Sequence, residues 1–294
     1  MTNYYDSFLS PQLISTLWDE AEAVDGIPEL RVGKGLQQEY PHIETREAFD
    51  FVCGLYEKVE EQLSSILEQR VIDREFIDQQ TISYLQKNET IPYHSKEYHT
   101  VIGDIDANGR LVVGPLETKE PIKKVHVPDF LKGPQVTLFG PPDTVKMSIN
   151  AMNSLHHQLP NEAPIVAELV ADSGHVPRWG ADNEDSKTPI MRNFLNACTN
   201  LIGCFDKTLA FDDLKKGRKY RLKEEGLALP IKRIPGLALP DGNHLYKGKA
   251  LPLHLYDFAM HLFHNWSKPE ALIFYVPKLE NEEEAAYVKT MILH

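Results

Sequence analysis

Three carboxylates lie within four residues in the second half of the chain: Asp182, Glu184 and Asp185. Their negative charges repel one another, so they need a cation, a metal ion or a good path to solvent. At the end of a strand they could orient a basic side chain or hold metal-bound water. Asp185 and Ser186 also fit the acidic amino-terminal cap of a helix that starts near residue 189. The pattern leaves both interpretations open.

Two cationic residues each lie within two residues of a proline at the end of an apolar run. Arg233 follows the run 229–231, and Lys278 follows the run 271–276. In α/β folds, residues just past the carboxyl ends of strands face the ligand. Both cations are therefore candidates for a functional site, and the alternative is a solvent-exposed cation in a loop.

Histidines also occur at a spacing that can bind a metal. His261 and His264 lie three residues apart on an expected helix, and His254 precedes them. This spacing can bind zinc, but no third acid or thiol lies nearby and the helix needs its apolar face for packing. We therefore predict packing or surface histidines and assign no metal ligand. His156 and His157 are equally uninformative.

A hairpin is predicted over residues 100–113, because the alternating sequence is interrupted by Asn108 and Gly109. Residues 104–109 also imitate the start of a calcium-binding loop. Pro115 stands where that loop requires a bidentate glutamate, so the hairpin is the preferred interpretation.

The amino-terminal part of the chain reads as mainly helical. Ser10 and Pro11 start a helix expected to run to about residue 24. A second helix is predicted over residues 46–71, and a short one near Asp73. The apolar stripe of the second helix consists of Val52, Leu55, Tyr56, Val59, Leu63, Ile66 and Leu67. We expect residues 1–130 to form a helical clasp domain that carries the β-hairpin.

The rest of the chain alternates between strands and helices. Residues 165–170 could be either a strand or a helix, and a charged stretch covers residues 206–225. The other expected elements are strands near 136–140, 229–231 and 271–276, the end of a strand with the acidic cluster within 179–189, and helices near 143–152, 189–202 and 255–266. Four strand–helix units predict a parallel sheet or barrel over residues 131–294.

Composition narrows the class of protein. The 294 residues are 42% hydrophobic and 25% charged, with a formal net charge of −12. This charge disfavours nucleic-acid binding and anionic membrane surfaces. No apolar run is long enough for a membrane span, and the first residues lack the pattern of a signal peptide. The three cysteines lack metal-ligand spacing and are typical of reduced thiols, so we expect a cytoplasmic protein.

Four motifs, in order along the chain, resemble those of the malate synthase family. FGPPDTVKMSINAMNS at 139–154 resembles "TGP-x-D-x-KM-x-INA-x-NS", and WGADNEDSKTPIMRNFLNACTNL at 179–201 resembles "ADFEDANSPTW-x-N". The stretch 232–265 resembles the "RPRGWHL…LFDF…FHN" block, and IFYVPKLENEEEA at 273–285 resembles "FYLPKLESHLEA". The resemblance covers roughly residues 127–285.

This resemblance implies a Claisen condensation in the glyoxylate bypass. Acetyl-CoA and glyoxylate would give malate and CoA on a (β/α)8 TIM barrel with Mg²⁺. By position in the motifs, Arg233 would stabilise the enolate, and Asp182 and Glu184 would hold that arginine or metal-bound water. Lys278 would help to bind substrate. The expected partners are therefore small molecules.

A full (β/α)8 barrel takes about 250 residues, whereas the barrel-like part here has about 160. We therefore expect only the amino-terminal half of a TIM barrel, in a fragment of a longer enzyme that is inactive alone. The family's main Mg²⁺ ligands and its proton-abstracting aspartate would then lie beyond residue 294. The sequence does not predict the oligomeric state.

Two alternatives remain. Pro235 stands where many relatives have a second arginine, and Leu237 replaces a tryptophan. These departures suit a degenerate barrel that serves as a binding or assembly module. A lyase or aldolase that acts on CoA esters and uses another 2-oxo acid is the second alternative.

Overall fold

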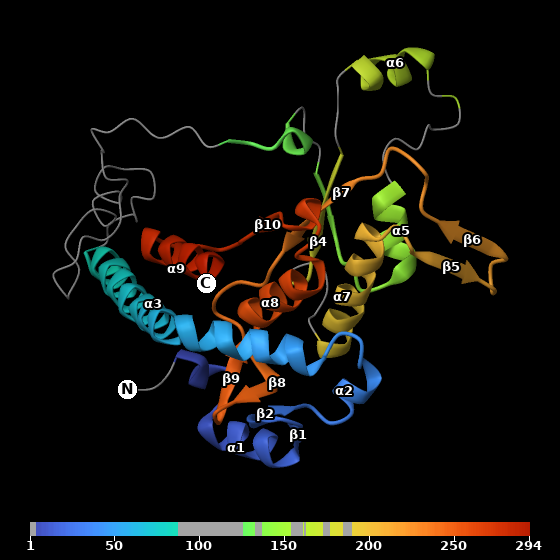
Figure 1. Cartoon of the computed structure of the whole chain (residues 1–294). Helices are drawn as coiled ribbons and strands as arrows, with labels where there is room; N and C mark the ends of the chain where they lie inside the picture. Colours follow the sequence, from blue (N-terminus) through green and yellow to red (C-terminus); the bar gives the residue numbers. More distant parts are fainter. Residues whose placement is uncertain are drawn as a thin grey trace. The chain divides into compact units, whose positions relative to one another are not determined.

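The computed structural model describes residues 4–87, 126–132, 137–153, 161, 163–172, 177–184 and 190–294 (Figure 1). The chain divides into two compact units: unit 1 comprises residues 1–8, 55–125 and 279–294, and unit 2 comprises residues 9–54 and 126–278. The predicted hairpin at 100–113, with its calcium-like loop, lies outside the described residues, as do His156 and His157. The predicted division into 1–130 and 131–294 stays a prediction.

Unit 1 is built around the greater part of one long helix. Figure 1 shows α3 (Arg46–Gln86) as uninterrupted, so the predicted end near residue 71 was wrong. No glycine or proline occurs between residues 71 and 86, so the backbone meets no helix breaker there. The predicted apolar stripe is confirmed, because all seven of its side chains are buried. The other elements of unit 1 are η1 (Tyr4–Ser7) and α9 (Glu282–Leu293).

A buried ion pair joins two helices of unit 1. Arg70 of α3 donates from Nε and Nη2 to the two carboxylate oxygens of Glu284, at 2.5 and 2.8 Å. Asn281 caps α9 by accepting a hydrogen bond from the Glu284 backbone N–H at 2.9 Å.

Unit 2 contains the predicted parallel sheet. Its strand order is β10-β7-β4-β3, and every neighbouring pair is parallel. These strands are β3 (Thr137–Gly140), β4 (Arg178–Asp182), β7 (Leu229–Arg233) and β10 (Phe274–Tyr275). The helices that alternate with them are α5 (Val145–Asn153), α6 (Pro164–Asp172), α7 (Met191–Phe205) and α8 (Leu253–Asn265). A mixed α/β fold with a parallel sheet is therefore confirmed, and the described strands form an open sheet edged by β3 and β10.

One side of this sheet packs against helices. Trp179 and Ala181 of β4 belong to a buried cluster with Met152, Leu201 and Cys204 from α5 and α7. Because side chains alternate along a strand, Gly180 and Asp182 point to the opposite side of the sheet. This alternation decides which polar side chains meet at the strand ends.

The second sheet of unit 2 is antiparallel and was not predicted as a whole. Its order is β1-β2-β8-β9, so a segment near the amino terminus pairs with one near residue 245. The strands are β1 (Glu22–Val24), β2 (Ile27–Val32), β8 (Pro240–Tyr246) and β9 (Lys249–Pro252). The charged stretch 206–225 contains a further hairpin, β5 (Ala210–Asp213) with β6 (Arg218–Arg221).

Other boundaries also differ from the sequence expectations. Residues 164–172 form the helix α6, which settles the ambiguity at 165–170. The first helix, α1 (Pro11–Glu20), ends before residue 24 because the chain turns into β1. The remaining short helices are α2 (Leu36–Glu39), η2 (Asp129–Leu131) and η3 (Pro269–Ala271). Among the helices of the described ranges, none is both long enough and apolar enough to cross a membrane.

Candidate active site

The predicted acids and cations meet where three parallel strands end. Asp182 is the last residue of β4 and Arg233 the last of β7, and the strand register places them side by side. Tyr275, the last residue of β10, lies beside Arg233 in the same way. Neighbouring parallel strands end at the same edge of a sheet, so their last side chains converge there.

Arg233 forms ion pairs with both predicted acids. Its Nη1 lies 2.6 Å from Asp182 Oδ2, and its Nη2 lies 4.0 Å from Glu184 Oε2. Lys278 Nζ approaches Glu184 from the other side, 2.7 Å from Oε1. We call Asp182, Glu184, Arg233 and Lys278 the strand-end cluster. The structure therefore brings together all four residues chosen from the sequence.

Backbone groups fix the position of Glu184 within the cluster. The Glu184 N–H donates to Asp182 Oδ1 at 2.9 Å, which closes a tight turn after β4. The Gly236 N–H donates to Glu184 Oε2 at 3.1 Å. Both carboxylates are thus held by the main chain as well as by cations. Asp185, the third acid of the sequence motif, lies outside the described residues.

Aromatic rings line the same side of the sheet. The Phe139 and Tyr275 rings meet edge to face with centroids 6.0 Å apart, and the Arg233 guanidinium lies 5.8 Å from the Tyr275 centroid. A Cβ at Gly180 would collide with the Phe139 ring, so the glycine leaves room for that ring. The cluster is therefore a charged site with an aromatic wall that is about half exposed, because Phe139 and Tyr275 are 50% and 47% exposed.

Exposure differs within the cluster. The side chains of Asp182, Arg233 and Glu184 are only 5%, 8% and 11% exposed, whereas that of Lys278 is 51% exposed. Lys278 also has a backbone φ of +58°, which is uncommon for a residue other than glycine. The arrangement places a buried guanidinium beside a solvent-accessible ammonium group. Such a pair of cations suits a substrate that carries one anionic group when it binds and has another oxygen that gains negative charge during the reaction.

The described part of the cluster does not by itself form a magnesium site. It offers two carboxylates, and cations already occupy both. Across the ranges that the structure describes, no group of three histidine, cysteine, aspartate or glutamate side chains is placed to hold a metal ion.

The histidines of α8 form separate hydrogen bonds. His261 Nε2 lies 2.9 Å from the Ala271 carbonyl oxygen, and His264 Nε2 lies 2.9 Å from the Ile43 carbonyl oxygen. Burial lowers the pKa of His261 to about 3, with the Lys232 charge as a further cause, so its imidazole is neutral. Both rings donate to backbone carbonyls, which supports a packing role.

A second charged cluster was not found from the sequence. His244 lies between two carboxylates, with Nδ1 2.6 Å from Asp241 Oδ2 and Nε2 2.8 Å from Glu44 Oε1. Tyr256 donates to the same Glu44 oxygen at 2.9 Å and stacks on the His244 ring with centroids 4.1 Å apart. We call Glu44, Asp241, His244 and Tyr256 the sealed histidine cluster, because all four residues are buried.

The environment of His244 favours its charged form. Burial lowers its pKa, but the carboxylates of Asp241 and Glu44 outweigh burial and raise the pKa to about 10. An imidazolium between two carboxylates joins β8, the segment before α3 and, through Tyr256, α8. No sequence pattern predicted this cluster, because Glu44 lies 200 residues from His244.

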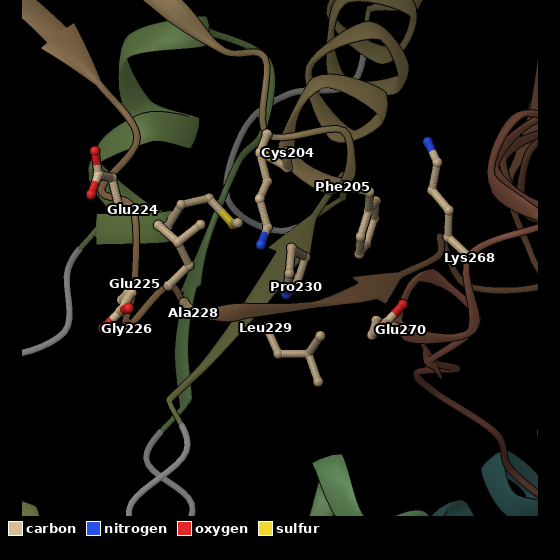
Figure 2. Close-up of a pocket in the computed structure, with 13 residues that line it drawn as sticks. Cys204, Phe205, Glu224, Glu225, Gly226, Ala228, Leu229, Pro230, Lys268 and Glu270 are labelled. Carbon is tan, nitrogen blue, oxygen red and sulfur yellow. The ribbon is translucent and has the colours of Figure 1, made fainter.

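A pocket of about 360 Å³ lies at the amino-terminal end of β7, opposite to the end that carries the strand-end cluster (Figure 2). Its wall includes Cys204 and Phe205 from the end of α7, Leu229 from the start of β7, and Glu270. Arg233 is the last residue of β7, so this pocket and the strand-end cluster lie at different ends of the strand. Ligands of parallel α/β folds bind at the carboxyl ends of strands, which favours the cluster as the active site.

The chain is similar to several malate synthases over part of its length. It is 27% identical over 263 residues to malate synthase A of Escherichia coli, covering 88% of this chain and 40% of that protein. It is 28% identical over 166 residues to malate synthase of Arabidopsis thaliana, covering 54% and 26% respectively. A bifunctional glyoxylate cycle protein of Caenorhabditis elegans is 31% identical over 170 residues, covering 55% and 15%.

These matches confirm the resemblance predicted from the four motifs and indicate a divergent, malate synthase-like chain. No protein-family model matches the chain. The chain spans less than half the length of the relatives described here.

Proposed function

From its likeness to malate synthases, we propose that this chain supplies part of the active site for a malate synthase-like condensation. In this reaction the methyl carbon of acetyl-CoA attacks the aldehyde carbon of glyoxylate, and water then releases malate and CoA. The observation that carries the proposal is the ion-paired Arg233 at the ends of β4 and β7, beside Asp182 and Glu184. The relatives named malate synthase support the same reaction.

Arg233 is proposed to stabilise the oxygens that gain negative charge. An enolate forms when acetyl-CoA loses a methyl proton, and an alkoxide forms when the new carbon–carbon bond is made. A fixed guanidinium can donate hydrogen bonds to either oxygen without reorganising during the reaction. Asp182, at 2.6 Å, and the main chain around Glu184 would hold this guanidinium in place.

Lys278 is proposed to bind the carboxylate of glyoxylate. The Lys278 side chain is half exposed and its ammonium group is ion-paired with Glu184, so an anion in solution can reach it. The site would then have two cations with different roles. Lys278 would attract the substrate, and Arg233 would respond to the charge that develops during the reaction.

Mg²⁺, which the likeness to malate synthases implies, would polarise the glyoxylate carbonyl when bound. The described residues do not form a site for it, and neither the metal ligands nor the base that takes the methyl proton is assigned to any of them. We further propose that the parallel sheet is the first half of a TIM-type barrel. The three cysteines are buried thiols without disulfides, which suits the proposed cytoplasmic location.

The test is malate formation by the protein expressed from its natural reading frame. Purified protein is incubated with acetyl-CoA, glyoxylate and Mg²⁺, and both free CoA and malate are measured. We expect equal amounts of the two products, and loss of both in Arg233→Ala. Folded protein that releases no CoA with glyoxylate would refute the proposal, and activity with another 2-oxo acid alone would support the lyase or aldolase alternative.

A further inference from the structure

A buried charged network lies directly behind the strand-end cluster. Lys232 Nζ lies 2.7 Å from the Asp257 carboxylate, and Asn183 Nδ2 donates to the same carboxylate at 3.1 and 3.3 Å. Lys232 is 2% exposed and Asp257 is 6% exposed at its side chain. None of these three residues stood out in the sequence, and none belongs to the strand-end cluster.

The network alternates with the cluster along the chain. Asn183 lies between Asp182 and Glu184, and Lys232 immediately precedes Arg233. Neighbouring side chains of a strand point to opposite sides of the sheet. Lys232 therefore points to the helix-covered side, where it meets Asp257 of α8, while Arg233 points to the side of the aromatic wall.

Asp257 thereby joins the ends of two strands. Lys232 belongs to β7, and Asn183 follows directly after β4. The register pairs Asp182 of β4 with Arg233 of β7, so the same two strand ends set the distance between these side chains. The Asp257 carboxylate therefore contacts, on the helix side, both strand ends that carry Asp182 and Arg233 on the other side.

The helix that carries Asp257 is itself firmly held. Phe258 packs on Phe274 of β10 with ring centroids 4.7 Å apart, and His261 is hydrogen-bonded to the Ala271 carbonyl. Burial raises the pKa of Asp257, and Lys232 and Asn183 oppose that effect. The ionised carboxylate thus depends on keeping both partners in position.

We propose that Asp257 is a positioning residue that acts through Lys232 and Asn183 to hold Arg233 and Asp182 at their productive separation. The inference rests on the proposed function of Arg233. Buried ion pairs can often be replaced by apolar side chains without loss of stability. An apolar replacement can restore stability, but it cannot supply the directed hydrogen bonds that link the two strand ends.

The experiment compares three variants with the wild-type protein. Asp257→Asn removes the charge while retaining the shape, and the double variant Lys232→Met with Asp257→Leu replaces the pair by apolar side chains. Glu284→Gln is the matched control, because it breaks the buried pair with Arg70 in unit 1. Each variant is examined by urea unfolding, by kcat and KM for glyoxylate, and by the NMR signal of the Arg233 Nε–H.

We expect Asp257→Asn to lower kcat by about 10–100-fold with a smaller change in KM, because small displacements of positioned groups are costly. The double variant should recover the stability that Asp257→Asn loses, while kcat stays low. The Arg233 Nε–H signal should shift or broaden in both. Glu284→Gln should reduce stability without changing either kcat or the Arg233 signal.

Two results would overturn the inference. One is recovery of kcat together with stability in the double variant, which would show a structural role alone. The other is an Arg233 signal in Asp257→Asn that matches the wild type. The NMR measurement needs no turnover, so a wild-type protein that forms no malate would refute the proposed function while the positioning role is still decided.

Discussion

The strand-end cluster and the sealed histidine cluster use similar chemistry for different ends. Each places a cation between two carboxylates at distances of 2.6–4.0 Å. In the sealed cluster His244 and Glu44 are completely enclosed, at 0% side-chain exposure. In the strand-end cluster Lys278 is 51% exposed. A ligand can therefore reach the strand-end cluster through Lys278, whereas the sealed histidine cluster is closed to solvent.

Position in the fold separates the two clusters as clearly as exposure does. The histidine cluster joins a loop residue, Glu44, to β8 and α8, and so links segments far apart in sequence. The strand-end cluster lies where parallel strands finish, the place where α/β folds bind ligands. Buried charge alone does not identify an active site. Charge at strand ends with a path to solvent is the more specific signal.

The largest effect that would sharpen this contrast is on stability. His244→Leu leaves Glu44 and Asp241 buried without their shared cation, so the free energy of unfolding should fall by about 3–5 kcal/mol. Urea unfolding at pH 7 measures the loss. The control is His42→Leu, because His42 is exposed and lies two residues before Glu44. Its free energy of unfolding should change by no more than about 0.5 kcal/mol. Equal losses in the two variants would contradict a structural role for the sealed cluster.

The next effect is on activity. Arg233→Lys keeps the charge beside Asp182 but loses the planar, forked donor, so kcat should fall by about 10²–10³-fold. Stability should change little by comparison. CoA release with glyoxylate measures the rate.

The matched control is Arg192→Lys. Arg192 forms an ion pair with Glu39 at 2.8 Å, but its side chain is 58% exposed and it lies on α7. This variant should retain wild-type kcat. A similar kcat in Arg233→Lys and the wild type would remove Arg233 from the reaction and favour a non-catalytic binding module.

Sequence patterns predicted the parts of the molecule that depend on local periodicity. The stripe of α3 and the strands of the parallel sheet were found because their apolar residues recur at helical or strand spacing. Strands β1 and β2 were missed, since β2 contains Pro28 and is completed by pairing with β8, more than 200 residues away. The β5–β6 hairpin was hidden because few apolar residues mark its strands.

The same distinction applies to the sites. Arg233, Asp182 and Glu184 could be chosen because each follows a recognisable strand and belongs to a motif. Asp257 could not, because its partner Lys232 lies 25 residues away and only the fold shows which helix covers which strand. Polar residues at strand positions that face a helix were the available signal.

The pH dependence of stability gives a further, smaller contrast. The folded-state pKa of His244 is raised to about 10, against an ordinary value of 6.5. A raised pKa in the folded state stabilises the fold fully below pH 6.5, and this contribution is lost as the pH rises toward 10. The wild-type free energy of unfolding should therefore fall by at most about 1.4 kcal/mol per pH unit in this window.

The decisive quantity is the difference between the wild type and His244→Leu, measured by urea unfolding between pH 6.5 and 9. Groups outside the sealed histidine cluster keep the same surroundings in both proteins, so their titration largely cancels. The difference should shrink steadily as the pH rises. A constant difference over this range would mean that His244 is not held as an imidazolium between its two carboxylates.

The smallest effects concern Lys278, whose backbone φ of +58° favours glycine. Both Lys278→Ala and Lys278→Gly remove the ammonium group near Glu184, so both should raise KM for glyoxylate, by less than about tenfold for an exposed cation. Lys278→Gly also relieves the backbone, and should be more stable than Lys278→Ala by about 0.5–1 kcal/mol.

Lys247 provides the control, because its φ is +51° in the turn between β8 and β9, outside the strand-end cluster. Lys247→Gly and Lys247→Ala should show the same stability difference, measured by urea unfolding, with no change in KM. A normal KM in Lys278→Ala would exclude Lys278 from substrate binding. The left-handed backbone at 278 would then serve only the turn after β10, and Arg233 would be the cation of the strand-end cluster that acts on substrate.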